Sequence, residues 1–401
     1  MKILAFASLI GGAIGAFACG GDSSGPSGPR AASVTGIAGD SQIAPTNVPL
    51  DFPLSMTLLG SNGQPIQGVS VTWSVVPSGG ALFTPQVSVS DANGIVSTTV
   101  TMGAIQDTIV ISATVPGVAQ PVVFHALAVD PCTFARSYTV GATANGVLTT
   151  YDCQAGGPFY TDFYIFSVGA QTGVTATMAA STFDAWLDAY RGNGKTLAVN
   201  NNIDNTTTNA QVELILAAGT YILAPNTYFQ NATGAYTLSS TVRAQTLSGC
   251  AEAWVSAGIT ITDNLATTDC IDSVGSGVYY DQVGIIAFPG DTLRFTGRST
   301  AFNPMLTLYR IDPAGFTQVA FNDDSAATTT AFINYPVTAT AGAVYVLYLG
   351  SPDTAATGAY TMIVDGSASV KQSPLLAPGW MRAGANQRFA ERSLPKTLTW
   401  H

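Results

Sequence analysis

The 401-residue sequence is poor in charged side chains. Asp, Glu, Lys and Arg make up 9% of it, where roughly 25% is usual in soluble domains. Exposed helix surfaces are normally rich in Glu, Lys and Arg, so this scarcity argues against extensive helix. Gly, Thr, Ser, Ala and Asn are abundant instead. We therefore expect a protein built from β-strands.

Positive charge is especially scarce. The chain has 14 Lys and Arg against 24 Asp and Glu, which gives a formal net charge of −10. Nucleic acid is excluded as an expected partner, because phosphate binding needs concentrated Lys and Arg. Apolar residues are plentiful at 47%, so this length is enough for roughly two to four domains that each bury a core.

Histidine is nearly absent, since His125 and His401 are the only two in the chain. Ser-His-Asp and Cys-His mechanisms therefore lack a base, and a zinc site is poorly supported because no CxxC pair occurs. His125 lies in the alternating segment 122–127 and is expected on the solvated face of a strand. We expect no enzyme.

The N-terminus has the features of a targeting segment, which is kept out of the fold argument. Residues 1–19 carry a positive charge near the start, then an apolar run, and end in small residues before Cys19. This segment resembles a bacterial lipoprotein signal, which implies lipid modification of Cys19. Ala16 and Phe17 depart from the family's preference, so secretion without lipid is the alternative, and the run is short for a transmembrane helix. Residues 20–31 indicate a flexible Gly/Ser/Pro tether.

Residues 32–130 are predicted to form an Ig-like β-sandwich. Segment 69–75 alternates with period two, as in a strand with one buried face, and Asp91-Ala92-Asn93-Gly94 is a turn signal. The order of strands and turns resembles bacterial Ig-like domains of the invasin and intimin type, and we assign Trp73 to the core. The resemblance is carried by residues 63–73, 91–94, 109–115 and 122–128.

The remainder of the chain is an internal repeat, with one copy at 131–244 and the second at 245–366. Landmarks recur in the same order at an offset that drifts from about 119 to about 124 residues, as short loop insertions produce. A unit this long exceeds a solenoid repeat and indicates a duplicated domain. The alignment pairs Tyr160 with Tyr280, Phe183 with Phe302, Asn200 with Asn322, and Tyr236 with Tyr360.

Each copy runs from an aromatic strand through a Gly turn, a Phe-Asp/Asn-x-x-Leu strand and an Asn/Asp-rich turn to Thr-Gly-Ala-Tyr. This order is similar to the bacterial pre-peptidase C-terminal domain, a jelly-roll-like sandwich appended to secreted proteases and other exported proteins. Its most specific parts are residues 322–324 and 357–360, and the first copy departs with Asn at 200–202. The expected fold class is all-β, with one Ig-like and two jelly-roll-like sandwiches in tandem.

The five cysteines divide between the signal and the repeats. Removing Cys19 leaves two in each repeat, Cys132 with Cys153 and Cys250 with Cys270, at near-equal spacings of 21 and 20 residues. This pattern indicates one local disulfide per repeat, which suits an oxidising periplasm or cell exterior. Free buried thiols are the alternative.

Calcium is the one cofactor that the sequence suggests. Asn322, Asp323 and Asp324 concentrate oxygen ligands in a single turn, as calcium requires. The alternative is an Asx turn, in which the side chains bond their own backbone. The first copy offers less charge, so weaker binding is expected there.

Two further patterns bear on binding and catalysis. The adjacent pairs Tyr228-Phe229 and Tyr279-Tyr280 each direct one ring outward from a strand, where a sugar could stack, although core packing is the simpler interpretation. Asp184 and Asp188 would share one face of a strand. Paired carboxylates therefore stay open, but the second copy has no acid at either position.

The C-terminal segment 367–401 differs from everything before it. It holds five of the fourteen basic residues, one acid and three prolines, so disorder is expected, with contact to anionic lipid or polysaccharide as an option. The whole sequence predicts a lipid-anchored, exported surface protein for adhesion, ligand binding or spacing. Its expected partners are the membrane and a polysaccharide or surface protein. An accessory part of an extracellular hydrolase system and a purely structural envelope protein are the alternatives.

Overall fold

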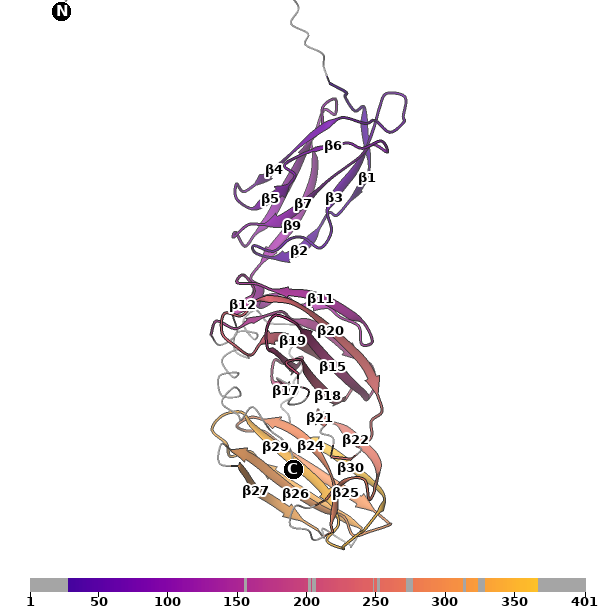
Figure 1. Cartoon of the computed structure of the whole chain (residues 1–401), viewed down its shortest axis with the longest axis vertical. Helices are drawn as coiled ribbons and strands as arrows, with labels where there is room; N and C mark the ends of the chain where they lie inside the picture. Colours follow the sequence, from indigo (N-terminus) through magenta and orange to yellow (C-terminus); the bar gives the residue numbers. More distant parts are fainter. Residues whose placement is uncertain are drawn as a thin grey trace, which may run out of the picture.

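The computed structural model describes residues 28–154, 157–200, 203, 207–247, 249–250, 253–271, 277–312, 315–323 and 329–366. Within these ranges the chain is almost wholly β-strand, and the 3-10 turn η1 (Pro131–Thr133) is the one helical element. The prediction of tandem β-sandwiches is confirmed, and Figure 1 shows them following one another along the longest axis. The predicted signal with Cys19 and the segment 367–401 lie outside the described residues.

The first sandwich packs a four-stranded sheet, β1-β3-β7-β5, against a five-stranded sheet, β2-β9-β8-β4-β6. Trp73 is fully buried between them, where its indole Nε1 donates a 2.9 Å hydrogen bond to Ser88. The core assignment of Trp73 is thus confirmed. His125 is exposed, as alternation predicts. The strands are β1 (Ser33–Ala38), β2 (Gln42–Pro45), β3 (Leu54–Leu59), β4 (Ser70–Val76), β5 (Ala81–Thr84), β6 (Val87–Val89), β7 (Ile95–Met102), β8 (Thr108–Thr114) and β9 (Val122–Val129).

The first repeat places a seven-stranded sheet opposite the strands β11-β20-β15-β18. The seven-stranded sheet has the order β10-β14-β19-β13-β12, with β16 paired to β19 and β17 paired to β16. The strands are β10 (Arg136–Ser137), β11 (Thr143–Leu148), β12 (Cys153–Gln154), β13 (Tyr160–Thr161), β14 (Tyr164–Val168), β15 (Thr172–Ala180), β16 (Ala185–Arg191), β17 (Thr196–Asn200), β18 (Ala210–Leu216), β19 (Gly219–Thr227) and β20 (Gly234–Arg243).

The second repeat repeats this plan. A four-stranded sheet, β22-β30-β25-β28, lies opposite the strands β21-β24-β29-β26-β27, with β23 paired to β24. The strands are β21 (Ala253–Val255), β22 (Ile259–Leu265), β23 (Cys270–Ile271), β24 (Tyr279–Ala287), β25 (Thr292–Ser299), β26 (Met305–Asp312), β27 (Gly315–Asn322), β28 (Thr330–Pro336), β29 (Ala343–Gly350) and β30 (Gly358–Gly366).

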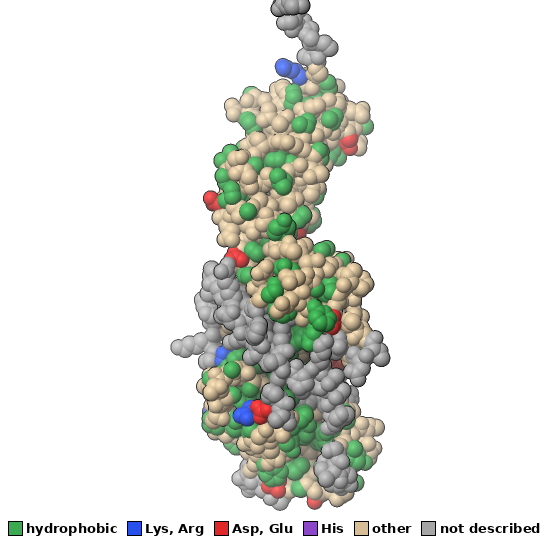
Figure 2. All heavy atoms as spheres, turned by 60° about the vertical axis from the view of Figure 1, so that its left-hand side comes forward, with side chains coloured by type: hydrophobic (Ala, Val, Ile, Leu, Met, Phe, Trp, Pro, Cys, Tyr) green, Lys and Arg blue, Asp and Glu red, His purple; other side chains and the backbone are tan. Residues whose placement is uncertain are grey.

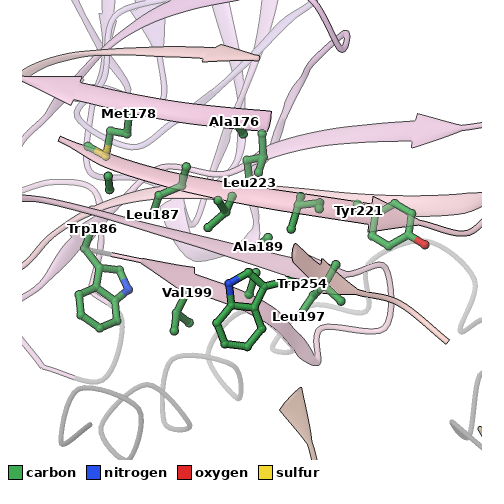
Figure 3. Packing of buried hydrophobic residues seen from close by; sticks show 14 of the residues in the cluster. Ala176, Met178, Trp186, Leu187, Ala189, Leu197, Val199, Tyr221, Leu223 and Trp254 are labelled. Atoms are coloured by element: carbon green, nitrogen blue, oxygen red, sulfur yellow. The ribbon is translucent and has the colours of Figure 1, made fainter. Parts of the chain in front are cut away.

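The two repeats share a sheet, which the sequence alignment did not indicate. Strand β21 pairs in parallel with β18 of the first repeat and in parallel with β24 of the second, so one ten-stranded sheet runs through both. Trp254 on β21 packs in the same apolar cluster as Leu197 and Val199 of β17 (Figure 3). The predicted boundary at 244/245 falls between β20 and β21, and the division into separate domains stays a prediction.

Polar contacts reinforce the junction between the repeats. Lys195 Nζ lies 2.8 Å from Asp291 Oδ1, and the Gln171 side chain accepts from the Thr260 amide at 2.8 Å and donates to its carbonyl at 2.7 Å. These side chains join the two copies in addition to the shared strand β21. We therefore describe the repeats as packed against each other, not merely tethered.

Strand register corrects one landmark of the repeat by a single residue. Cys153 begins β12 and pairs with Thr161, and Cys270 begins β23 and pairs with Tyr280. Tyr160 therefore corresponds to Tyr279, not to Tyr280. The alignment of Asn200 with Asn322 is upheld, because these residues pair with Leu187 and Leu306 at corresponding places in the two hairpins.

Both predicted disulfides are present. Cys132 is bonded to Cys153 and Cys250 to Cys270, with Cα–Cα distances of 4.6 and 4.7 Å. Each bridge ties the entry of a repeat to the strand that leads into its aromatic strand. Free thiols are thus ruled out for these four residues in the structure.

Candidate functional site

The strands that carry the candidate site are buried on both faces. In β16 every residue from Ala185 to Tyr190 is buried, in β19 every residue from Tyr221 to Thr227, and in β24 every residue from Tyr280 to Ala287. The opposite strands β20 and β30 instead alternate between buried and more exposed residues. Continuous burial is typical of a sheet covered by a layer on each side.

We call the side of β14, β16, β19, β24, β26 and β29 that points away from their own sandwich core the outer face. In β16 the residues Trp186, Asp188 and Tyr190 project to it, two positions apart. The Asp188 carboxylate accepts hydrogen bonds from the Trp186 indole at 2.5 Å and from the Tyr190 hydroxyl at 3.2 Å. Asp188 is fully buried, so its carboxylate lies inside the surface formed by these aromatic side chains.

Aromatic rings gather on the outer face of the first repeat. Trp186 packs against Tyr228 with ring centroids 5.9 Å apart, and Tyr228 meets Phe229 edge-on at 5.0 Å. Phe229 is 55% exposed at the margin of this cluster. Of the predicted pair, Tyr228 is therefore half-buried while Phe229 is directed to solvent.

A second aromatic cluster occupies the outer face of the second repeat. Tyr280 stacks on Tyr348 at 4.3 Å, Tyr309 lies 5.0 Å from Tyr348, and Phe316 meets Tyr309 edge-on at 6.2 Å. Phe316 is 44% exposed. The neighbouring Tyr279 packs against the sandwich core instead, so this adjacent pair divides between the two faces as strand alternation requires.

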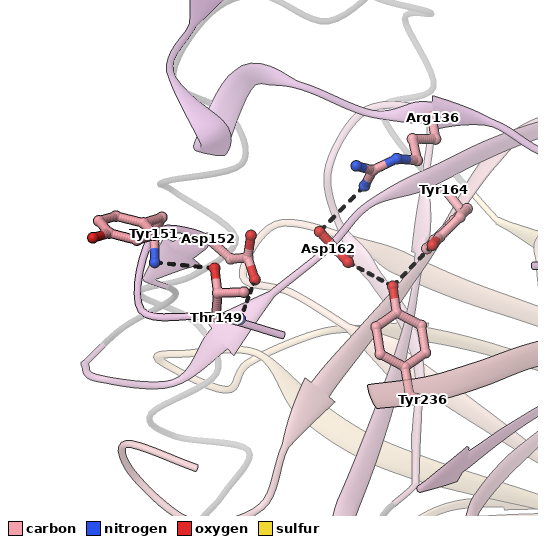
Figure 4. A network of polar contacts seen from close by, with 7 residues as sticks. All are labelled: Arg136, Thr149, Tyr151, Asp152, Asp162, Tyr164 and Tyr236. Atoms are coloured by element: carbon pink, nitrogen blue, oxygen red, sulfur yellow. Dashed lines mark hydrogen bonds and ion pairs between the residues drawn. The ribbon is translucent and has the colours of Figure 1, made fainter. Parts of the chain in front are cut away.

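A buried acid–tyrosine pair links the two sheets of each repeat. In the first repeat, the Tyr236 hydroxyl donates to Asp162 Oδ2 at 2.6 Å and lies 2.9 Å from the Tyr164 hydroxyl, while Arg136 approaches Asp162 Oδ1 at 3.4 Å (Figure 4). Burial raises the pKa of Asp162, although Arg136 opposes the rise. Burial and the nearby Asp162 charge raise the pKa of Asp152 to about 7.

The second repeat has the same pair without the arginine. The Tyr360 hydroxyl donates to Asp281 Oδ2 at 2.7 Å. Asp281 is fully buried, and its Oδ1 has no hydrogen-bond partner among the described residues. Burial raises the pKa of Asp281 to about 8, with smaller contributions from Asp269 and Asp263. Both pairs join β-sheets within a sandwich, which is a structural role.

Sequence reasoning did not single out these two acids. The available signal was the repeat itself, because Asp162 and Asp281 each follow the residue that pairs with the second cysteine of their copy. The register correction described above brings them into alignment. At the offset of 119 residues that aligns Phe183 with Phe302, Asp162 falls opposite Asp281, so the repeat alignment carried the signal.

The structure describes only part of the turn that was suggested to bind calcium. Asn322 Oδ1 accepts a hydrogen bond from the Phe332 amide at 3.0 Å, and Asn200 Oδ1 accepts one from the Gln211 amide at the corresponding place. Asp323 is half-buried, and Asp324 lies outside the described residues. Among the residues described, no group of three or more His, Cys, Asp or Glu is placed to hold a metal ion. Calcium binding stays a prediction.

Within the part of the chain that the structure describes, there is no helix that could span a bilayer. Of the two acids that could share one strand face, Asp188 lies in β16, where its oxygens accept hydrogen bonds from Trp186 and Tyr190, and Asp184 directly precedes that strand. Paired-carboxylate chemistry at these two residues stays open.

Comparison with known proteins yields likenesses in fold only. No family model matches the chain, and no curated protein matches it. Among solved structures it is similar to the pre-peptidase C-terminal domain of a collagenase from Bacillus anthracis, at 17% identity over 27% of this chain and 95% of that one, with a TM-score of 0.23.

Two longer structures are also similar. InvD of Yersinia pseudotuberculosis shows 13% identity over 75% of this chain and 82% of that one, with a TM-score of 0.18. SGBP-B of the Bacteroides ovatus mixed-linkage glucan utilization locus, solved with a mixed-linkage heptasaccharide, shows 12% identity over 80% and 74%, with a TM-score of 0.14. Scores this low carry no argument about what this chain binds.

Proposed function

We propose that this chain is a non-catalytic, exported protein of the bacterial envelope that binds polysaccharide through its outer face. The observation that carries the proposal is the repetition of an aromatic cluster on the corresponding face of both repeats. Sugar rings stack on exposed aromatic rings, and the exposed ring at the margin of each cluster, Phe229 in the first and Phe316 in the second, would engage successive parts of one polymer. Simultaneous engagement of two weak sites raises the overall affinity without new contacts.

Export is supported by the two disulfides, which form and persist in oxidising compartments. The Gly/Ser/Pro segment 20–31 would hold the folded part away from a membrane to which lipidated Cys19 is anchored. Mass spectrometry of the mature N-terminus tests the anchor. A diacylated or triacylated Cys19 is expected, and an unmodified N-terminus beyond that position would remove the anchor from the proposal.

Binding is tested with a glycan array followed by affinity electrophoresis in the polysaccharide that scores highest. Phe229→Ala and Phe316→Ala are each expected to weaken binding by about 5- to 10-fold, or about 1 kcal/mol. Phe332→Ala is the matched control, since this ring is similarly exposed, at 42%, on the opposite sheet. Equal losses of polysaccharide binding in all three variants would count against a specific role for Phe229 and Phe316. Binding to a surface protein but to no polysaccharide would count against polysaccharide as the ligand.

A further inference from the structure

The sheet opposite the outer face has a surface hollow at the same place in each repeat. In the first repeat the hollow spans β11, β20 and β15, and in the second it spans β22, β30, β25 and the start of β28. Both hollows include the threonine that follows the aligned tyrosine, Thr237 in the first copy and Thr361 in the second. Their volumes are about 690 and about 350 Å³. The duplication therefore provides two related surface sites whose linings can be compared.

The two hollows differ in how their polar groups are used. In the first, Thr237 Oγ1 donates to Asn145 Oδ1 at 3.2 Å, and Asn209 Oδ1 accepts from the Ala180 amide at 3.1 Å. In the second, five threonine hydroxyls make no hydrogen bond to any residue that the structure describes, namely those of Thr262, Thr300, Thr329, Thr330 and Thr361. A hydroxyl both donates and accepts, so the second hollow presents hydrogen-bonding groups to an external ligand.

The second hollow also holds an unpaired cation. Arg298 is exposed, and it makes neither an ion pair nor a hydrogen bond through its side chain within the described ranges. The other basic side chains of the described repeats each contact a carboxylate, an amide or a backbone carbonyl, and they are Arg136, Arg191, Lys195, Arg243, Arg294 and Arg310. In a chain with 24 acids against 14 bases, an arginine without an acid beside it is available to an anion from outside.

Arg298 is specific to the second copy. It pairs with Thr361 across the sheet, whereas the residue that pairs with Thr237 at the corresponding place is Ala179. None of the residues that line the second hollow is acidic. The guanidinium group is planar and binds carboxylate or sulfate oxygens through two parallel hydrogen bonds. The second hollow is therefore suited to an oxyanion, and the first is not.

A second arginine lies on the same strand face. Arg294 and Arg298 are both exposed on β25, four residues apart, which corresponds to about 13 Å along a strand. Arg294 donates through Nε to Asn334 at 3.1 Å, so its position is fixed beside β28. Two cations in line favour a polymer that carries acidic groups at intervals over a single small anion.

We propose that the hollow of the second repeat binds the acidic groups of a polysaccharide, with Arg298 bonded to the oxyanion and the threonine hydroxyls bonded to sugar hydroxyls. The site goes beyond the function proposed above, because it lies on the opposite sheet and uses none of the aromatic rings. The hydroxyls that surround Arg298 favour a hydroxylated chain over an acidic peptide.

Isothermal titration calorimetry of the full mature chain with galacturonan oligomers tests the site. Arg298→Ala is expected to weaken binding at least about 10-fold, because it removes a charge-assisted pair of hydrogen bonds. Arg298→Lys keeps the charge but not the planar group, so it should recover only part of the affinity. Arg30→Ala, an equal loss of charge at an exposed position in the first sandwich, is the control and should stay within about 2-fold.

A second pair of variants tests the hydroxyls without altering charge. Thr361→Val should weaken binding about 3-fold, because one hydrogen bond to the ligand is lost. Thr237→Val is the matched control at the corresponding place in the first hollow and should leave binding unchanged. Fully methyl-esterified galacturonan should bind the unaltered chain as weakly as the acidic oligomer binds Arg298→Ala.

Other polymers identify the source of the oxyanion. Dextran sulfate that depends on Arg298 in the same way would add sulfated sugars to the ligands of the site. Polyglutamate that binds as tightly as galacturonan, and loses affinity equally in Arg298→Ala, would overturn polysaccharide as the ligand.

Three results would overturn the site itself. They are equal losses in Arg298→Ala and Arg30→Ala, equal affinities for the acidic and the esterified oligomer, and no binding of any acidic polysaccharide. Binding that is lost in Phe316→Ala but kept in Arg298→Ala would also overturn it, while supporting the function proposed for the outer face. Binding that depends on Arg298 but not on Phe229 or Phe316 would support this site alone.

Discussion

At the scale of single residues, the acid–tyrosine pairs show how one interaction is adapted within a duplicated sequence. Asp162 and Asp281 each accept a hydrogen bond from a tyrosine across the sandwich. Arg136 accompanies the first acid, whereas no described group accepts from or donates to the second oxygen of Asp281. A buried carboxylate without such compensation is stable chiefly in its neutral form.

The first prediction concerns Asp281 and pH. Its pKa is about 8 in the folded chain and 3.8 ordinarily, so the folded state keeps a proton that the unfolded state has released. The free energy of unfolding should therefore fall as pH rises from about 4 to about 8. Asp281→Asn should remove this slope and exceed the unaltered protein in stability at pH 9 by about 1–3 kcal/mol.

Urea denaturation between pH 5 and pH 9 measures this difference. Asp353→Asn, an exposed acid of the same repeat, serves as the control and should leave the slope in place. A parallel pH dependence in the unaltered chain and in Asp281→Asn would contradict the burial argument. Asp152, with a pKa of about 7, adds a dependence of the same sign in the first repeat.

A residue's position could be predicted from sequence where it depends on a local pattern, and could not where it depends on a partner far along the chain. Trp73 and His125 were assigned correctly because strand alternation is a local pattern and needs no knowledge of partners. The bond between Asp162 and Tyr236 joins residues 74 positions apart, and nothing local marks it. Likewise, the burial of Trp186 and Asp188 on the outer face depends on what covers a sheet, which strand periodicity does not encode.

At the scale of elements, the disulfides and the Asn/Asp turns are the parts where the two copies can be compared directly. The copies place a bridge at the same entry strand and an asparagine at the same hairpin end. Differences in behaviour between the copies can then be traced to single substitutions.

The second prediction is that each bridge stabilises the folded state mainly by restricting the unfolded chain. Closing a loop of 21 residues should contribute about 3 kcal/mol. Cys132→Ala with Cys153→Ala is expected to lose this amount in chemical denaturation, and the corresponding double variant at Cys250 and Cys270 should lose a similar amount. Unchanged midpoints in both double variants would show that the bridges do not contribute to stability.

The third prediction concerns the turn at residues 322–324. If it binds calcium, millimolar calcium should raise the melting temperature above that in EDTA, and Asp323→Asn should reduce the increase. The same substitution should lower stability little in EDTA, because the Asn322 bond to the Phe332 amide is retained. Identical melting temperatures in calcium and EDTA would assign the turn to backbone hydrogen bonding alone.

At the scale of the whole molecule, the repeats are one packed unit while the first sandwich has a separate core. Charged side chains are sparse on the face seen in Figure 2, in keeping with a chain that is 9% charged. Composition and turn spacing correctly predicted an all-β chain and the first sandwich, and the resemblance to the pre-peptidase C-terminal domain predicted a sandwich for each repeat. It did not predict the shared sheet, because β21 is only three residues long and its pairing with β18 is set by the packing of the copies.

The fourth prediction is that calorimetry resolves two unfolding transitions and not three. Trp254 is 6% exposed in the cluster at the repeat junction, and Trp254→Ala should cost about 3 kcal/mol or more and lower the transition of both repeats together. Trp73→Ala should lower only the other transition. Three transitions, or a Trp254→Ala effect confined to a single repeat, would show that the copies unfold independently.

The parallel strand between the repeats also constrains how such a chain can evolve. A chain that stopped after the first repeat would leave the edge of β18, at Leu214 and Ile215, without its partner β21. An unpaired apolar strand edge recruits strands from other molecules and leads to aggregation. Loss of the second copy would therefore produce an aggregation-prone protein and not a shorter functional one. Selection is expected to retain or lose the two copies together.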